Sequence, residues 1–90
     1  MKRLKQSSRF KKDLKRIQHN PKKIEKLEIV LELLKESGTV PPEYSPHLLV
    51  GQYKGYMECH IEGDFLLIWI DESEDIIKLT RLGSHSELFK

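Results

Sequence analysis

Three histidines, an arginine and an aspartate in the second half of the chain have the residue types of a reactive cluster. They are His47, His60, Asp64, Arg81 and His85. Histidine gives and takes protons near neutral pH, and a guanidinium binds phosphate oxygens through paired hydrogen bonds. These groups suit cleavage of RNA without a metal ion. In that reaction a base takes the 2′-OH proton, a cation stabilises the pentavalent phosphate and an acid protonates the 5′-oxygen.

Other chemistry has less support from the residues. Zinc accepts His, Cys and Asp ligands, but strand alternation points Cys59 away from His60, and the chain has no CxxC or HExxH pattern. Serine hydrolysis would need a nucleophile-elbow pattern, which "GSHS" lacks. The histidines can also be structural, and Arg81 can form a simple surface ion pair with Asp64 or Glu62.

The elements that must position the cluster are predicted to be strands. The stretches "HLLVG", "GYMECHIEG", "DFLLIWIDE" and "DIIKLTRLG" are rich in β-branched, aromatic and aliphatic residues. Along "GYMECHIE", Met57, Cys59 and Ile61 alternate with a second set of side chains that includes His60. Turn signals at Glu62-Gly63 and at "ESED" (72–75) predict an antiparallel meander of three or four strands.

This meander brings the reactive residues to one end of the sheet. A turn at 62–63 places His60 near Asp64, and a second turn at 73–74 places Arg81 alongside Phe65 and Leu66. His85 follows four residues later, and His47 enters at the same end if its strand joins that edge. His19 lies outside the cluster, on the helical part of the chain.

Two helices are expected before the sheet. The first begins at Ser7 or Ser8 with the apolar spacing of Phe10, Leu14 and Ile17, and "HNP" (19–21) stops it. The second begins near Pro21 and ends at Gly38. A short strand in "KRLK" can precede them, and the proline-rich segment 39–46 is a loop. The expected fold is a single α+β domain over residues 1–90, a helical hairpin packed on the meander.

Charge is distributed unevenly along the chain. Residues 1–26 hold eleven lysines and arginines and two acidic residues, which gives this segment a charge of +9. Because the net charge of the chain is +2, residues 27–90 carry a charge of −7. Such a basic segment favours polyanions, RNA above all, or an acidic protein segment. No apolar run approaches the length of a membrane span, no secretory signal is evident, and a single cysteine fits the reducing cytoplasm.

The strings "HLLVGQYKGYMECHIEGDFLLIW" and "LTRLGSHSELF" resemble the YafQ branch of the RelE/ParE toxins, over nearly the whole chain. Those toxins cut messenger RNA in the ribosomal A site. The resemblance makes His85 the proton donor to the leaving group and Arg81 the phosphate ligand. It leaves open which of His47, His60 and Asp64 is the general base. By position it also implies nucleotide contacts for Phe65, where relatives often have tryptophan, and for Phe89.

The resemblance also implies partners. Ribosomal RNA would meet the basic helices and messenger RNA the reactive cluster, and a cognate antitoxin would bring an acidic segment that folds on binding. No cofactor and no membrane are expected, and the toxin alone is expected to be monomeric. A ParE-like toxin that acts without cleavage and a subunit of a repressor complex remain alternatives. The candidate phosphate ligands of the helices are Lys11, Lys12, Lys15, Arg16, Lys22 and Lys23.

Overall fold

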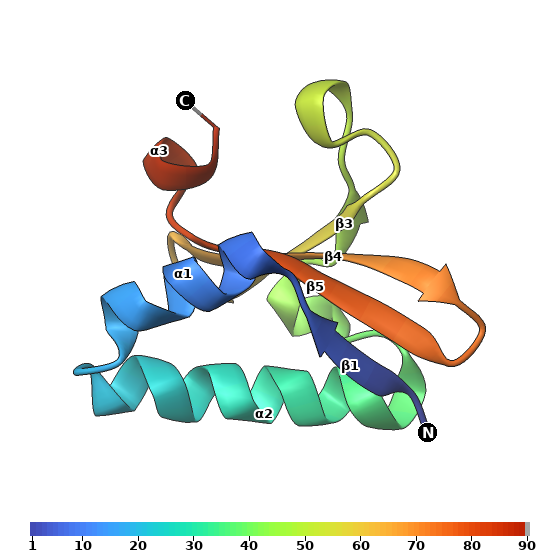
Figure 1. Cartoon of the computed structure of the whole chain (residues 1–90), viewed down its shortest axis with the longest axis horizontal. Helices are drawn as coiled ribbons and strands as arrows, with labels where there is room; N and C mark the ends of the chain where they lie inside the picture. Colours follow the sequence, from blue (N-terminus) through green and yellow to red (C-terminus); the bar gives the residue numbers. More distant parts are fainter. Residues whose placement is uncertain (90) are drawn as a thin grey trace.

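Two helices lie on one face of a five-stranded sheet in this computed structural model, which describes residues 1–89 (Figure 1). Lys90, the last residue of the expected domain, lies outside the described residues. The strands follow the spatial order β1-β5-β4-β3-β2. The bounds are β1 Arg3–Gln6, α1 Ser8–Ile17, α2 Pro21–Ser37, β2 His47–Leu48, β3 Met57–Glu62, β4 Phe65–Ser73, β5 Ile76–Gly83 and α3 His85–Leu88. Two short 3₁₀ helices, η1 (Pro42–Tyr44) and η2 (Gly51–Tyr53), flank β2.

Local signals set the ends of the helical hairpin as predicted. The Ser7 hydroxyl caps α1 by accepting the Phe10 N–H at 3.0 Å. Asn20 caps α2, whose first residue is Pro21, and Gly38 caps its C-terminal end with a φ of 79°. A left-handed φ of this kind strains any residue with a Cβ, so glycine suits the position.

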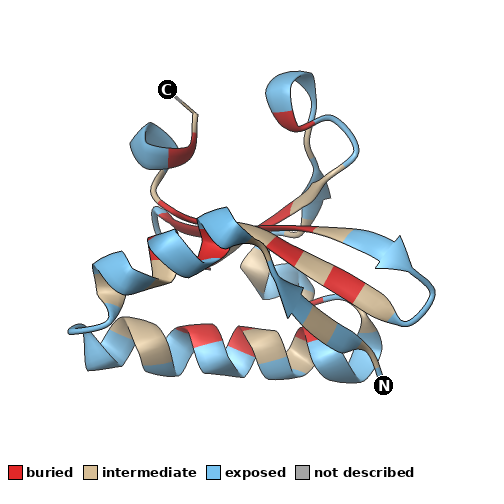
Figure 2. Cartoon of the chain, in the orientation of Figure 1, coloured by how far each residue is buried: buried red, intermediate tan, exposed pale blue. Residues whose placement is uncertain are grey.

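The two faces of the sheet are buried by different partners. Toward the hairpin, alternate strand residues pack with Phe10 and with the α2 stripe Leu27, Val30 and Leu34. On the other face, Leu66 and Ile68 pack with Tyr53 and Leu88. Figure 1 shows α3 and the loop around η2 rising on this second face, and Figure 2 shows the buried residues concentrated in the central strands and the inner side of α2. The reactive residues belong mainly to the second face.

The sheet is mixed, whereas the sequence predicted an antiparallel meander of three or four strands. Strands β2 to β5 do form that meander. The short strand β1 adds a fifth member by pairing parallel to β5, Arg3 opposite Ile76 and Gln6 opposite Leu79. Parallel pairing needs a long crossover connection, and the whole helical hairpin and meander provide it. Nothing local in "RLKQ" specifies this partner.

The predicted register of Arg81 was wrong by about two residues. The turn between β4 and β5 lies after Ser73, at 74–75, and the register shifts again between Ile68 and Trp69. Arg81 therefore pairs with Ile68, and Gly83 takes the place opposite Leu66. β5 continues to Gly83, so Arg81 does not end the strand.

The turn between β3 and β4 also differs from the expectation. It lies at Gly63-Asp64, one residue later than predicted, with a register shift between His60 and Glu62. Asp64 is consequently a turn residue, exposed and free to contact the segment after β5. Within residues 1–89, no helix is both long and apolar enough to cross a membrane.

Candidate functional site

The polar residues of the site form two rows across the open face of the sheet. In the first row His47 pairs with Glu58, Glu58 with Ile68, and Ile68 with Arg81. Directly opposed strand residues share a face, so the row runs across four strands on one side. In the second row His60 pairs with Leu66, which pairs with Gly83, two residues before His85. Residues far apart in sequence therefore meet, as predicted.

Glu58 is the buried centre of the histidine side of the site. Glu58 is only 2% exposed to solvent. Its Oε1 lies 3.2 Å from Nε2 of His47 and 3.9 Å from Nε2 of His60. Over residues 1–89, Glu58 Oε2 is the buried side-chain oxygen with no hydrogen-bond partner. An unpartnered buried carboxylate oxygen is costly, and costs of this kind are common at functional sites.

The hydrogen bonds of the two rings indicate where protons reside. His47 Nδ1 lies 2.8 Å from the Ser45 carbonyl and His60 Nδ1 lies 3.1 Å from the Gly63 carbonyl. A carbonyl only accepts, so each Nδ1 carries a hydrogen. The contact between His47 Nε2 and Glu58 Oε1 is then a hydrogen bond only if a further proton lies between them. Nε2 of each ring is therefore the nitrogen that faces the Glu58 carboxylate.

His85 and Asp64 form a second, exposed unit. The backbone N–H and the Nδ1–H of His85 both donate to Asp64 Oδ1, at 2.9 and 2.8 Å. These bonds, the backbone one first, lower the pKa of Asp64 below its usual range. Because Nδ1 is engaged, Nε2 of His85 is the nitrogen left to face a substrate. The ring centroid of His85 is 6.0 Å from that of His60.

Short α3 holds His85 and was not predicted. Ser84 and Glu87 form a reciprocal capping box around its first turn, and Leu88 is buried against the open face, as expected for an anchor. The S-x-x-E spacing of Ser84 and Glu87 is a sequence signal that identifies this helix start. A four-residue helix is too short to show the apolar periodicity by which longer helices are predicted from sequence.

Aromatic rings line the same face next to His85. The Phe89 ring lies 5.7 Å from the His85 ring and meets the Tyr53 ring edge-on at 5.5 Å. Tyr53 also contacts Tyr56 edge-on. Phe89 is partly exposed beside the reactive groups, where a nucleotide base could stack on its ring.

Phe65 lies in a different environment. It is 5% exposed and belongs to the core on the helical face, with the Lys23 ammonium 5.1 Å above its ring. Its side chain is therefore on the face opposite Leu66 and the histidine rows. Because so little of Phe65 is exposed, its predicted nucleotide contact lacks the access that the partly exposed Phe89 has.

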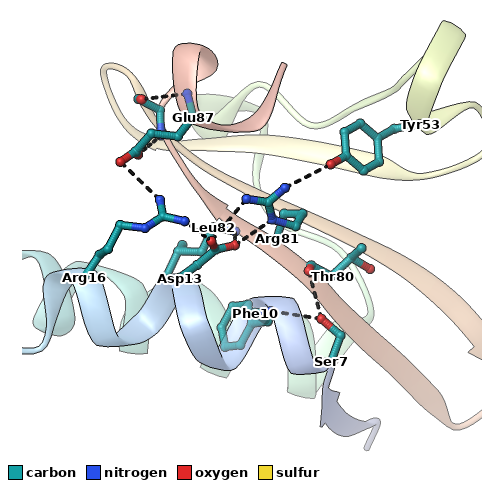
Figure 3. Close-up of polar contacts among 10 residues, drawn as sticks. Ser7, Phe10, Asp13, Arg16, Tyr53, Thr80, Arg81, Leu82 and Glu87 are labelled. Atoms are coloured by element: carbon teal, nitrogen blue, oxygen red, sulfur yellow. Dashed lines mark hydrogen bonds and ion pairs between the residues drawn. The ribbon is translucent and has the colours of Figure 1, made fainter. Parts of the chain in front are cut away.

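Arg81 is held from the side of α1, where the sequence predicted no partner (Figure 3). Its Nε and Nη2 donate to the two oxygens of Asp13 at 2.8 and 3.2 Å, and its Nη1 donates to the Tyr53 hydroxyl at 3.3 Å. The hydrogen bonds to Asp13 are the largest cause that raises the pKa of the Arg81 guanidinium above its usual value. Arg81 therefore remains positively charged at neutral pH.

The six predicted phosphate ligands lie on the helical hairpin. Lys11, Lys12, Lys15, Arg16 and Lys22 are exposed and Lys23 is partly buried. Arg16 is also anchored, because one terminal nitrogen contacts Asp13 at 2.6 Å and the other contacts Glu87 at 3.1 Å. The hairpin and α3 are thus joined by an ion pair next to the site (Figure 3).

Sequence reasoning missed Asp13, Tyr53 and Glu58. Asp13 had a visible signal: in α1 it stands three residues after Phe10, inside the apolar stripe and amid basic residues. Glu58 shared the face of His60 by alternation, but its pairing with His47 depends on a two-residue strand that no pattern reveals. Tyr53 lies in η2, whose position over the sheet is a tertiary feature.

Cys59 belongs to the core and not to the site. Its side chain is buried on the helical face, and burial raises the pKa of its thiol to about 12. In the part of the chain described, no group of three His, Cys, Asp or Glu side chains has metal-binding geometry.

Comparison with known proteins places this arrangement in a family. Residues 2–90 match the model of the bacterial toxin of type II toxin–antitoxin systems, YafQ. The chain belongs to the YafQ toxin family. Among YafQ relatives, the mRNA interferase toxin YafQ of Escherichia coli K12 is 33% identical over 92% of this chain and 90% of its own length.

Two solved structures share the YafQ fold at full length. The toxin in the E. coli DinJ–YafQ complex has a TM-score of 0.85 and 31% identity, with both chains fully covered. A metal-bound toxin from Helicobacter pylori has a TM-score of 0.85 and 38% identity, covering 99% of this chain and all of its own. The five-stranded mixed sheet and hairpin are therefore those of a YafQ toxin.

Proposed function

We propose that this YafQ-family protein is the toxin of a type II toxin–antitoxin system and an endoribonuclease that cuts messenger RNA on the ribosome. The relatives named mRNA interferase support the reaction. The observation that carries the proposal is the meeting of His85, the His47–Glu58–His60 set and Arg81 on one face. Proton donors, proton acceptors and a fixed cation are what RNA cleavage through the 2′-OH requires.

His85 acts as the general acid. Its Nδ1–H is bonded to Asp64, which fixes the ring and leaves Nε2 as the reactive nitrogen. As the bond between phosphorus and the 5′-oxygen breaks, the Nε2 proton goes to that oxygen, and the next nucleotide leaves with a free 5′-hydroxyl. Asp64 is thereby an orienting group for His85, as carboxylates are for catalytic histidines elsewhere.

The base is the set formed by Glu58, His47 and His60. It accepts the proton of the 2′-OH while the 2′-oxygen attacks phosphorus, which leaves a 2′,3′-cyclic phosphate on the upstream fragment. The ring centroids of His60 and His85 are 6.0 Å apart, so base and acid are close enough to act on the same phosphate. Arg81 stabilises the extra negative charge of the pentavalent phosphate.

The basic hairpin docks the toxin on ribosomal RNA. Five of its six candidate phosphate ligands are exposed, and binding through them releases counterions. Each lysine removed from the contact should therefore weaken binding and reduce its salt dependence. The partner that blocks this activity is a cognate antitoxin with an acidic segment. The DinJ–YafQ structure of E. coli, named a toxin–antitoxin complex, supports a partner of this kind. The free toxin is proposed to be a cytoplasmic monomer.

Primer extension on messages from cells expressing the chain tests the proposal. The wild type should give cuts at fixed positions within codons, and His85→Ala should remove them. His19→Ala is the matched control, because His19 is exposed in the turn after α1, away from the cluster. Growth arrest with intact messages would instead favour a toxin that acts on another target without cleavage.

The proposed chemistry needs no metal ion, and a relative that binds metal makes this worth testing directly. Purified toxin should cut mRNA on purified ribosomes equally well after the toxin alone is treated with a chelator and dialysed. Activity that is lost by this treatment and restored by zinc or copper would overturn the metal-free mechanism while leaving the nuclease assignment intact.

A further inference from the structure

Asp13 is an acidic residue buried in a basic helix. In α1 it is the only acid among ten residues, and it is 2% exposed. Both carboxylate oxygens are used: Oδ1 accepts from Arg16 and Arg81, and Oδ2 accepts from Arg81 and from the Leu82 backbone N–H. A buried carboxylate persists only where its lone pairs are satisfied. Figure 3 shows these contacts converging from α1 and β5.

One part of this arrangement is structural. β1 pairs with β5 only from Ile76 to Leu79, so the edge of β5 beyond that point has no strand beside it. α1 lies along the edge instead. The Ser7 hydroxyl donates to the Thr80 carbonyl at 2.8 Å, and Asp13 Oδ2 accepts the Leu82 N–H at 2.9 Å. Capping the edge of β5 would need one acceptor at position 13, and an asparagine oxygen could provide it.

The contact of Asp13 with Arg81 uses both carboxylate oxygens, which a residue that only accepted the Leu82 N–H would not need. A guanidinium has five N–H donors; Asp13 binds one on Nε and one on Nη2, and Tyr53 binds one on Nη1. One N–H on each terminal nitrogen remains. A bidentate carboxylate fixes the plane of the guanidinium, and Tyr53 fixes it from the other side. The two remaining donors thus have a set direction before any substrate arrives.

We propose that Asp13 is a positioning residue for RNA cleavage, which aims the two unused N–H groups of Arg81 at the scissile phosphate. The inference rests on the proposed function, in which Arg81 is the phosphate ligand. Preorganised donors stabilise a transition state without reorganising during the reaction. Asp13 itself touches no substrate, since both of its oxygens are engaged within the protein.

A double-mutant cycle on cleavage of ribosome-bound mRNA tests this inference. Asp13→Asn keeps an acceptor for the Leu82 N–H but cannot form the charged fork with Arg81. We expect it to lower kcat about tenfold to a hundredfold with KM nearly unchanged, and Asp13→Glu to restore part of the loss. In an Arg81→Ala background, Asp13→Asn should cost nothing further. Equal losses in both backgrounds, or a wild-type rate for Asp13→Asn alone, would overturn the proposal.

Ser7→Ala is the matched control for stability. It removes the cap of α1 and its contact with Thr80 on the same edge of β5, but it leaves Arg81 and Asp13 bonded. If Ser7→Ala lowered kcat as much as Asp13→Asn at equal loss of stability, the role of Asp13 would be structural only. If Asp13→Asn fails to fold, Arg81→Lys decides: lysine keeps the charge without the fork, and undiminished cleavage by that variant would refute positioning.

An NMR measurement separates this inference from the proposed function. The Nε–H signal of Arg81 in the wild type should shift on titration with a short RNA carrying a 2′-deoxy group at the cut site. In Asp13→Asn that shift should be lost. If the wild type cuts no message, the proposed function fails. The NMR titration would then still test the inference, because it reports whether Arg81, oriented by Asp13, binds phosphate.

Discussion

The Arg81–Asp13 side and the His85–Asp64 side of the site are built in opposite ways. Arg81 has a side chain that is 12% exposed, and its Asp13 partner is saturated with hydrogen bonds. The side chains of His85 and Asp64 are 56% and 60% exposed, and Nε2 of His85 has no hydrogen-bond partner among residues 1–89. A group that supplies constant charge benefits from rigidity and low dielectric. A group that moves protons must exchange them with substrate and water.

This contrast separates stability from chemistry. The Asp13 contacts join α1 to β5 and contribute to both folding and the site. The Asp64–His85 contact is on the surface, where ion pairs contribute little to stability, so its value is in orienting a ring. Substitutions on the two sides should therefore differ more in their effect on folding than in their effect on cleavage.

The largest expected effect follows from removing the buried carboxylate. Asp13→Ala leaves the Nε–H and one Nη2–H of Arg81, together with the Leu82 N–H, without their acceptor, and the loss of one member of a buried pair costs about 3 kcal/mol or more. Urea denaturation of Asp13→Ala and Asp64→Ala compares the two sides directly. Asp64→Ala should unfold close to the wild-type midpoint. Equal midpoints for the two variants would contradict the contrast.

A smaller effect is expected from pH. Bonds from His85 lower the pKa of Asp64, so the stability they provide is complete above the ordinary carboxyl pKa of about 4 and is lost as the pH falls below it. The difference in unfolding free energy between wild type and Asp64→Asn should be constant down to about pH 5 and shrink toward pH 3. If this free-energy difference changed mainly between pH 6 and 8, a histidine and not Asp64 would be the titrating group.

The smallest effect is expected at Cys59, on the other face of the sheet from His60. With its pKa raised to about 12, the thiolate fraction at pH 8 is on the order of one in ten thousand. Iodoacetamide should leave the native protein unmodified and alkylate it fully in urea, as read by mass spectrometry. Rapid native alkylation would mean that the core under the histidine rows opens readily.

Local signals predicted the parts of the fold that local interactions determine. Ser7, Pro21 and Gly38 marked the ends of the helices, and alternation sorted Met57, Cys59 and Ile61 onto the helical face. The approach of the histidines and Asp64 to one end of the sheet also followed from the meander.

What could not be predicted depends on long-range packing. The partner of β1, the shift in register that pairs Arg81 with Ile68, and the contact of Asp13 with Arg81 all join distant segments. A turn displaced by one residue along "ESED" moves every pair beyond it. No pattern in a single amino-acid sequence distinguishes strands with such a register shift from strands with regular pairing.

The parallel pairing of β1 with β5 has a consequence for folding kinetics. Ser7 and Thr80 are 73 residues apart in sequence, and Asp13 and Arg81 are 68 apart. Contacts at such separations close slowly, because a long loop must be ordered before they form. During refolding, the hairpin and meander can form before Arg81 is held in place. Helical signal should therefore return earlier than nuclease activity when the denatured toxin is refolded.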